Sequence, residues 1–218
     1  MAESDTASPR ERYRAQVREE IKKQAWAQIA EAGTSALSLN AIAKQIGMTG
    51  PALYRYFANR DDLITELIRD AYRSLADVFH GRAEAGADLT ELAQALRDWA
   101  LADPQRYLLL YGTPVPGYQA PPDTTAIAAE LMAVLLDAVG PGPTPAPSTP
   151  LHEHLDDHRA WAAGHPADPA GLHTALVFWT RLHGVLSLEL AGHFTGMGFD
   201  PAQLYAAEVD AVTATRTD

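Results

Sequence analysis

The chain has 218 residues, of which 47% are hydrophobic and 21% are charged, a composition typical of a globular protein rather than a disordered one. It contains no cysteine, which excludes disulfides, thiolate chemistry and cysteine-ligated zinc. No apolar run of about 18 residues lacks a charge, and the N-terminus has no signal-like apolar core, so we expect a cytoplasmic protein that does not span a membrane.

The net charge of −11 is unevenly distributed along the sequence. Residues 1–60 contain nine Lys or Arg and six Asp or Glu, a local charge of +3. The other 158 residues contain eight Lys or Arg and 22 Asp or Glu, a charge of −14. This asymmetry indicates a small basic module joined to a larger acidic body, so the net charge does not exclude a nucleic-acid partner.

Apolar residues recur three or four positions apart and do not alternate, so the predicted fold class is all-α. A first helix is expected over about 9–32, ended by Gly33, because glycine adopts the left-handed conformation without steric cost. Ser38 is expected to cap a second helix that reaches Ile46.

A short third helix is expected to be capped by Thr49, with Pro51 in its first turn, where the missing N–H costs nothing. A longer fourth helix is expected to begin at Asn59 and to end near Gly81. Further helices are expected at about 88–102, 104–111, 123–139, 151–163, 169–194 and 201–214.

Residues 38–57, SLNAIAKQIGMTGPALYRYF, carry the functional signal. Two short amphipathic helices joined by a glycine-containing turn make a helix-turn-helix, and a helix of about two turns fits a major groove about 12 Å wide. Leu53 and Phe57 are expected to point into the core, with the three residues 54–56 on the opposite side. The free backbone N–H groups at Thr49 and Gly50 could meet a phosphate.

The alternative interpretation of this segment is a helical hairpin that only builds an all-α core. The run Tyr54–Arg55–Tyr56 argues against it, because a buried hairpin has no need of three large side chains with polar tips in a row. The basic leading helix in an otherwise acidic chain points the same way. The groove-binding interpretation is therefore preferred.

The segment AIAKQIGMTGPALYRYFANRDDLI resembles the DNA-binding region of TetR-family transcriptional regulators, and the resemblance covers about residues 10–70. It implies a homodimer whose paired recognition helices read a palindromic double-stranded operator, and a C-terminal domain that binds a small molecule. Ligand binding would move the helix after the motif and release the DNA. The segment WTRLHGVLSLELAGHF (179–194) is similar to one C-terminal type in that family, marked by Trp and His-Gly.

The resemblance also implies which positions of this chain contact DNA. These are Ser38, Asn40, Thr49, Gly50, Pro51, Ala52, Tyr54, Arg55, Tyr56 and Arg60. Since Gly50 and Ala52 stand where many relatives have larger polar side chains, specificity is expected to depend on methyl contacts and DNA shape. The cations of the first helix either contact phosphate as well or form a solvated face; they are Arg10, Arg12, Arg14, Arg18, Lys22 and Lys23.

The helix at 169–194 is apolar nearly all round, so it must be buried on most sides. We expect it to form a dimer interface with the helix at 201–214, the alternative being a central core helix of the monomer. Aromatic residues with two polar anchors could line a pocket for an apolar or aromatic ligand, although such residues also occur as plain core. They are Trp99, Arg106, Tyr107, Tyr111, Phe178, Trp179 and His183.

The segment HEHLDDH raises the question of a metal site at His152, His154 and His158, but it lacks the glutamate and spacing of a zinc hydrolase. We expect a polar surface helix there, with no metal, cofactor or catalytic residue.

Together these observations predict a DNA-binding domain at 1–59 and a ligand-binding and dimerisation domain at 60–218. The predicted function is that of a ligand-responsive repressor and not an enzyme. Two alternatives remain open: a helical enzyme that uses the histidine segment, and a protein-interaction module with a degenerate helix-turn-helix.

Overall fold

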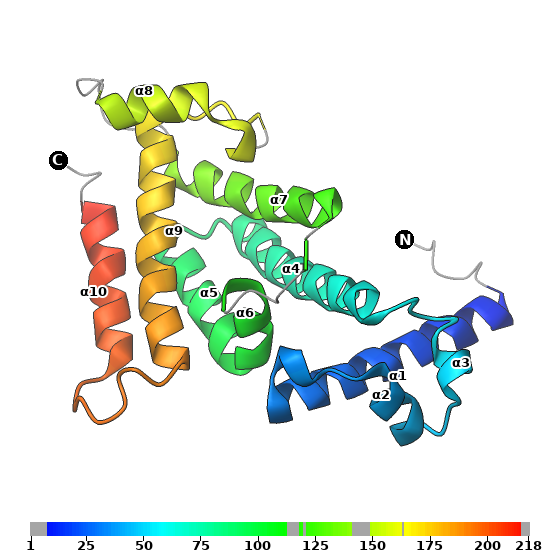
Figure 1. Ribbon diagram of the computed structural model, residues 1–218. Coiled ribbons are helices and arrows are strands. Elements are labelled where there is room, and N and C mark those ends of the chain that lie inside the picture. The colour runs from blue at the N-terminus through cyan, green and yellow to red at the C-terminus, as the bar shows by residue number, and fades with distance from the viewer. Residues whose placement is uncertain (1–7, 113–117, 120, 141–148, 163, 215–218) are drawn as a thin grey trace. The chain divides into compact units, whose positions relative to one another are not determined.

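A computed structural model describes residues 8–112, 118–119, 121–140, 149–162 and 164–214 (Figure 1). Within these ranges every regular element is helical, which confirms the predicted fold class. Two are short 3-10 turns, η1 (Thr34–Ala36) and η2 (Ala160–Ala162). The α-helices are α1 (Pro9–Ala32), α2 (Leu39–Gln45), α3 (Gly50–Leu53), α4 (Arg60–Glu84), α5 (Leu89–Ala102), α6 (Pro104–Tyr111), α7 (Pro122–Val139), α8 (Pro150–Asp157), α9 (Pro169–Leu190) and α10 (Pro201–Ala214).

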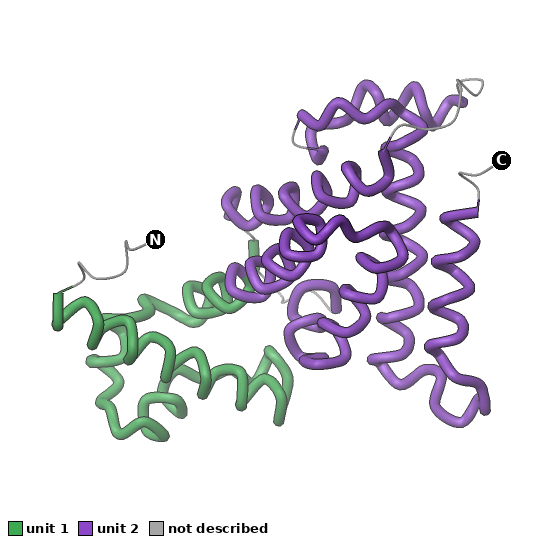
Figure 2. The backbone as a smooth tube through the Cα atoms, turned by 180° about the vertical axis from the view of Figure 1, so that it is seen from behind, with its two compact units in different colours: residues 1–68, 113–119 green, residues 69–112, 120–218 purple. Residues whose placement is uncertain are grey.

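The chain divides into two compact units, which Figure 2 colours separately. Unit 1 comprises residues 1–68 and 113–119, and unit 2 comprises residues 69–112 and 120–218. Helix α4 contributes its first nine residues to unit 1 and the remainder to unit 2. Among the described residues, no helix is long and apolar enough to cross a membrane.

The helices of unit 1 begin and end where the sequence predicts. The Ser8 hydroxyl accepts a hydrogen bond from the Glu11 N–H while the Glu11 carboxylate accepts one from the Ser8 N–H, a reciprocal cap on α1. Gly33 ends α1 at φ 77°, a left-handed conformation that favours glycine. Ser38 caps α2 by accepting from the Ala41 N–H. The fully buried side chains of this unit include Ile21, Ile42, Leu53, Phe57, Leu63 and Leu67.

Three helix ends differ from the prediction. Helix α4 continues through Gly81 to Glu84, because a glycine inside a helix weakens it without stopping it, and the turn comes at Gly86, where φ is 82°. Helix α9 ends at Leu190, followed by turns, and not at 194. Helix α8 ends at Asp157 and gives way to η2.

Helix α9 is the centre of unit 2, where it contacts α7, α8 and α10, with α10 alongside it (Figure 1). Its inward face is fully buried at Leu172, Phe178 and Leu182. The Tyr205 hydroxyl of α10 donates to the Ala93 carbonyl of α5 at 2.7 Å. Because α9 is packed on several sides, it is a core helix of unit 2, although it exposes Leu188. The expected dimer interface stays a prediction.

Candidate nucleic-acid interface

The helix-turn-helix consists of α2, a turn at Gly47 and the short helix α3. Gly47 adopts φ 69°, and the Met48 N–H donates to the Ala43 carbonyl at 2.8 Å, which closes the turn. Helix α3 has only four α-helical residues, and the chain then continues in tighter turns. The Arg55 N–H donates to the Ala52 carbonyl and the Tyr56 N–H to the Leu53 carbonyl, a 3-10 pattern that keeps the element short.

The start of α3 lies against α2 through a small residue. Thr49 occupies the N-cap position with extended backbone, but its side chain makes no capping bond. A Cβ added at Gly50 would lie 3.4 Å from Oδ1 of Asn40, so glycine lets the Asn40 amide lie close to the beginning of α3. Asn40, Thr49 and Pro51 are exposed, whereas Ser38, Gly50 and Ala52 are half-buried. The contact between Gly50 and Asn40 thus brings the N-terminal ends of α2 and α3 together, and the exposed positions lie on or beside these two ends.

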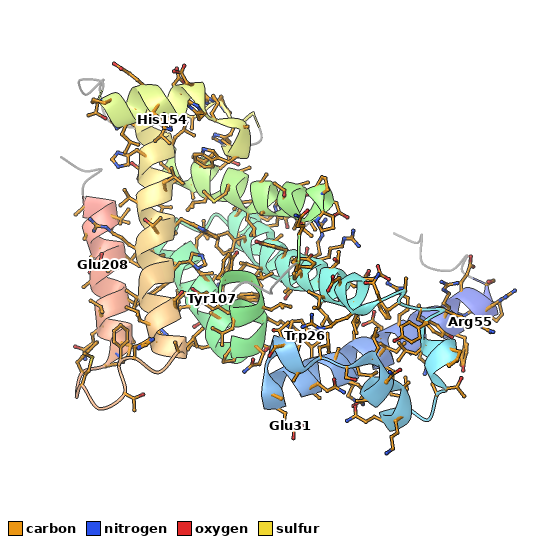
Figure 3. All side chains as sticks on the ribbon, viewed as in Figure 1. Trp26, Glu31, Arg55, Tyr107, His154 and Glu208 are labelled. Atoms are coloured by element: carbon orange, nitrogen blue, oxygen red, sulfur yellow. The ribbon has the colours of Figure 1, made fainter. Side chains whose placement is uncertain are left out.

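After Leu53 the side chains divide between core and surface. Leu53 and Phe57 are fully buried, as predicted. Tyr54 is 45% exposed and Arg55 is exposed as well, and Figure 3 labels Arg55 beside α3. Tyr56 is half-buried, with the Arg14 guanidinium 5.9 Å from its ring centre. Tyr54 and Arg55 are therefore the large side chains that this turn presents to solvent.

Arg18 of α1 holds the C-terminal end of this element in place. Its guanidinium donates to the Tyr56 carbonyl at 2.7 Å, pairs with the Glu66 carboxylate of α4 at 2.9 Å, and lies 4.3 Å from the centre of the Phe57 ring. Arg14 adds a longer bond of 3.4 Å to the Arg55 carbonyl. We call α3 and the turns that follow it, residues 50–57, the recognition element. Arg18 thus connects α1, the end of this element and α4.

Arg60, the remaining position implied for DNA contact, stands at the first residue of α4. Its guanidinium donates to the Thr34 carbonyl at 2.7 Å and lies 3.9 Å from the Asp61 carboxylate. The side chain is therefore half-buried and connects the start of α4 to η1. Any contact it makes with a phosphate has to coexist with this bond or replace it.

Four of the residues predicted to line a pocket come together in unit 2. Tyr107 and Tyr111 of α6 lie against His183 of α9, with ring centres 5.5 and 4.3 Å from the imidazole, and Trp179 lies 4.2 Å from it. Tyr72 of α4, which the sequence did not single out, joins the cluster 6.2 Å from Tyr111. We call these five side chains the aromatic cluster; Tyr107 is labelled in Figure 3.

The other three predicted pocket residues have separate environments. Trp99 Nε1 donates to the Ser74 hydroxyl at 3.1 Å, and Arg106 approaches the same oxygen at 3.5 Å and pairs with Asp103 at 3.0 Å. Phe178 is fully buried in the core.

The histidine segment shows no clustering of the kind a metal needs. His154 and His158 stack at 4.2 Å, while His152 turns to His173 of α9, with Nε2 and Nδ1 3.2 Å apart. Burial, and then the neighbouring His152, lower the pKa of His173. Among the described residues no three His, Cys, Asp or Glu side chains are arranged to hold a metal ion.

Comparisons with known proteins identify the family. The profile described as bacterial regulatory proteins of the tetR family matches residues 21–67, and that of the tetracyclin repressor-like C-terminal domain matches residues 89–212. The transcriptional regulator Mb1846 of Mycobacterium bovis, of the helix-turn-helix type, is 33% identical over 98% of both chains. The chain belongs to the TetR family of transcriptional regulators. It is a DNA-binding regulator of the helix-turn-helix type and not an enzyme.

Solved structures of relatives agree with the fold of this regulator. A crystal structure described as that of a regulatory protein, SCO4313, is 64% identical, covers 95% of this chain and 100% of its own, and superposes with a TM-score of 0.89. FadR from Bacillus subtilis, crystallised in complex with stearoyl-CoA, is 14% identical, covers 89% of this chain and 96% of its own, and has a TM-score of 0.54. At that identity the second likeness concerns the fold alone.

Sequence reasoning missed what Arg18 and Lys22 do. The sequence does not distinguish them from the other cations of the first helix, yet Lys22 is buried and pairs with Glu19 at 2.6 Å, and Arg18 contacts three groups. Their spacing from the buried apolar residues of α1 is the signal that distinguishes Arg18 and Lys22 from the other cations of this helix. Arg18 and Lys22 lie three residues before Ile21 and Ala25 respectively, next to the buried face of α1.

Arg18→Lys tests this positioning role, because it keeps the charge but loses the planar fork that reaches two partners at once. We expect DNA affinity to fall about tenfold, since a hydrogen bond to a charged group contributes about 1.5–3 kcal/mol. Without DNA, amide exchange of Tyr56 and Phe57 should become faster. Affinity is measured by mobility shift on a duplex that the protein selects from a random pool.

The matched control is Arg73→Lys, which alters the ion pair of Arg73 with Glu130 in unit 2. It should leave both affinity and exchange at residues 54–57 unchanged. If Arg18→Lys has the same DNA affinity and the same amide exchange at residues 54–57 as Arg73→Lys, Arg18 does not position the recognition element.

Proposed function

We propose that this regulator is a homodimeric repressor that binds a palindromic operator through residues 38–60 and leaves it when unit 2 binds a small molecule. Residues 1–59 form the DNA-binding domain and residues 60–218 the ligand-binding and dimerisation domain. As a regulator of chromosomal genes, it would act in the cytoplasm. The observation that carries the proposal is the exposed end of α2 and α3, where polar and aromatic side chains stand on a buried apolar base.

The DNA contacts proposed here divide into two kinds. Tyr54 and Arg55 are large, exposed and mutually adjacent, so their hydroxyl and guanidinium can reach phosphates or base edges without rearranging the core. The second kind is made by the small residues Gly50 and Ala52, which would allow the backbone of α3 to approach the base edges in the major groove. The full set is Ser38, Asn40, Thr49, Gly50, Pro51, Ala52, Tyr54, Arg55, Tyr56 and Arg60.

The charge distribution supports this orientation. Lys44 and Arg55 are exposed cations of the motif, and no ion pair connects either of them to another described residue. Residues 61–218 carry a charge of −14, which repels the phosphate backbone. A basic motif on an acidic body favours approach of the duplex to unit 1.

The dimer interface proposed here uses α9 and α10. The exposed surface of α9 carries Thr180, Gly184 and Leu188, and its C-cap residue Ala191 continues this row, at spacings of three or four residues. The outward surface of α10 carries Ala207, Ala211 and Ala214. Such small side chains let the helices of two protomers approach closely around Leu188, which is 45% exposed in the monomer.

The ligand site proposed here is in unit 2 and includes the residues expected from the sequence to line a pocket: Trp99, Arg106, Tyr107, Tyr111, Phe178, Trp179 and His183. Helix α4 provides the route to DNA, since it carries both Tyr72 of the aromatic cluster and Glu66, the partner of Arg18. A ligand that shifts α4 would disturb the Arg18 contacts and with them the end of the recognition element. The stearoyl-CoA complex of FadR makes acyl-CoA one ligand class to test.

Tyr54→Ala tests the DNA surface. Tyr54 is exposed, so we expect the free energy of unfolding to change by no more than about 0.5 kcal/mol, while affinity for the selected duplex falls tenfold or more, as expected for about 1.5–3 kcal/mol lost from a bond to phosphate. Tyr54→Phe removes only the hydroxyl, so the affinity of this variant shows how much of the loss comes from the hydroxyl and how much from the ring.

Leu151→Ala is the matched control, because Leu151 is also 45% exposed but lies on α8 of unit 2. Binding by Tyr54→Ala that equals binding by this control would remove Tyr54 from the interface.

Leu188→Arg tests the dimer. A charged side chain at the centre of a helical interface should convert the dimer to a monomer at micromolar concentration, as measured by sedimentation equilibrium. Leu151→Arg places the same charge at an equally exposed site on α8 and should leave the dimer intact. A dimer that survives Leu188→Arg contradicts the proposed interface.

A further inference from the structure

The aromatic cluster is built from side chains that remain partly accessible to solvent. Tyr72, Tyr111, Trp179 and His183 are each half-buried, whereas Tyr107 beneath them is fully buried. The ring pairs are tilted or edge-on, at interplanar angles from 51° to 87°, apart from Tyr107 and His183, which are nearly parallel at 19°. Accessible rings in several orientations offer a surface on which a flat apolar molecule can pack.

Within the cluster, the hydroxyl of Tyr107 has hydrogen-bond partners, whereas two polar atoms of Tyr111 and His183 have none. The Tyr107 hydroxyl lies 2.9 Å from His183 Nδ1, 2.9 Å from the Ser187 hydroxyl and 3.3 Å from the His183 carbonyl. By contrast, the Tyr111 hydroxyl and His183 Nε2 are shielded from solvent and have no hydrogen-bond partner. Two such atoms on rings 4.3 Å apart are costly, because a buried polar group without a partner loses its hydration and gains nothing in return.

Both unpartnered groups are uncharged at neutral pH. Burial lowers the pKa of His183 to about 3, so its imidazole stays neutral. Burial, followed by the neighbouring Tyr72 and Tyr107, raises the pKa of Tyr111 well above its usual value, so its hydroxyl keeps its proton. Tyr111 can therefore donate a hydrogen bond, and His183 Nε2 can donate or accept according to its tautomer.

Among the described residues, no charged side chain hydrogen-bonds to Tyr107, Tyr111 or His183. The hydrogen bonds of Tyr107 and His183 run to each other and to Ser187, all uncharged groups. Arg106, the cation of α6, is already paired with Asp103 at 3.0 Å. An ionised group brought here would lose its hydration without gaining a partner charge.

We infer that the effector of this regulator is an uncharged aromatic molecule whose carbonyl or hydroxyl group hydrogen-bonds to the Tyr111 hydroxyl and His183 Nε2 while its ring packs on Trp179 and Tyr72. The inference depends on the proposed function, in that unit 2 is taken to be the ligand-binding unit. It departs from the acyl-CoA class, whose phosphates carry several negative charges.

Calorimetric titration of the full-length protein with three matched probes tests this inference. The probes are 2-acetylnaphthalene, which is uncharged and carries a carbonyl; naphthalene, which lacks it; and 2-naphthoate, which is anionic. We expect 2-acetylnaphthalene to bind about tenfold more tightly than naphthalene, in line with one added hydrogen bond, and 2-naphthoate and stearoyl-CoA to bind more weakly than either.

Tyr111→Phe gives a signature that a merely structural role would not produce. It removes a hydroxyl that has no partner, so the midpoint of thermal unfolding should stay the same or rise, while the preference for 2-acetylnaphthalene over naphthalene disappears. Tyr107→Phe is the control: it removes a hydroxyl with three neighbours within 3.3 Å, so it should lower the midpoint.

Three outcomes overturn the inference: no binding of 2-acetylnaphthalene, tighter binding of 2-naphthoate or stearoyl-CoA, or an unchanged preference in Tyr111→Phe. A mobility shift with the selected duplex, run on the same protein, separates the two proposals. Tight binding of stearoyl-CoA that releases DNA would overturn the inference alone, whereas loss of all DNA binding would overturn the proposed function.

Discussion

The position of the recognition element depends on one guanidinium. Helix α3 has four residues, too few for an isolated helix to be stable, so its placement has to come from neighbours. Arg18 supplies it by binding the Tyr56 carbonyl, covering the Phe57 ring and pairing with Glu66. Beneath these contacts Leu53 and Phe57 are fully buried, so the apolar core fixes the inner face of the element while Arg18 fixes its end.

The proposed control by a ligand would act through the same contact. Glu66 lies on α4, six residues before Tyr72 of the aromatic cluster in the same continuous helix. A helix is stiff over this distance of less than two turns, so a displacement at Tyr72 would be transmitted to Glu66. The proposed effector would act by changing how α4 presents Glu66 to Arg18, and would need only a small shift to loosen an element as short as α3.

The sequence predicted best those features that depend on local chemistry. Ser38 and Gly33 cap their helices as expected because a cap is decided by one residue and its nearest N–H groups. Leu53 and Phe57 are buried because their spacing places them on the inner face. The sequence did not predict that α4 would pass Gly81, since packing along the helix outweighs the weakness of one glycine.

Roles that depend on distant partners could not be predicted. Arg18 looks like any other cation of α1 until Glu66, 48 residues away, is brought to it by the fold. His183 was chosen as a polar anchor, but its neutral state follows from burial against Tyr107, Tyr111 and Trp179, which only the packing of α6 on α9 creates. The DNA contacts likewise stay predictions, because which side chains meet a base depends on the shape of the duplex as well as on the protein.

The most direct test of the account is the salt dependence of binding to the selected duplex and to a scrambled duplex of the same composition. Arg55 and Arg60 in two protomers would neutralise about four phosphates, so the logarithm of affinity for the selected duplex should fall linearly with the logarithm of salt concentration, with a slope of about −3 to −4. The scrambled duplex should bind at least 1000-fold more weakly at physiological salt, on the order expected for specific over non-specific binding. Affinity that is independent of salt, or equal for the two duplexes, would contradict the claim that this acidic chain reads DNA through its basic end.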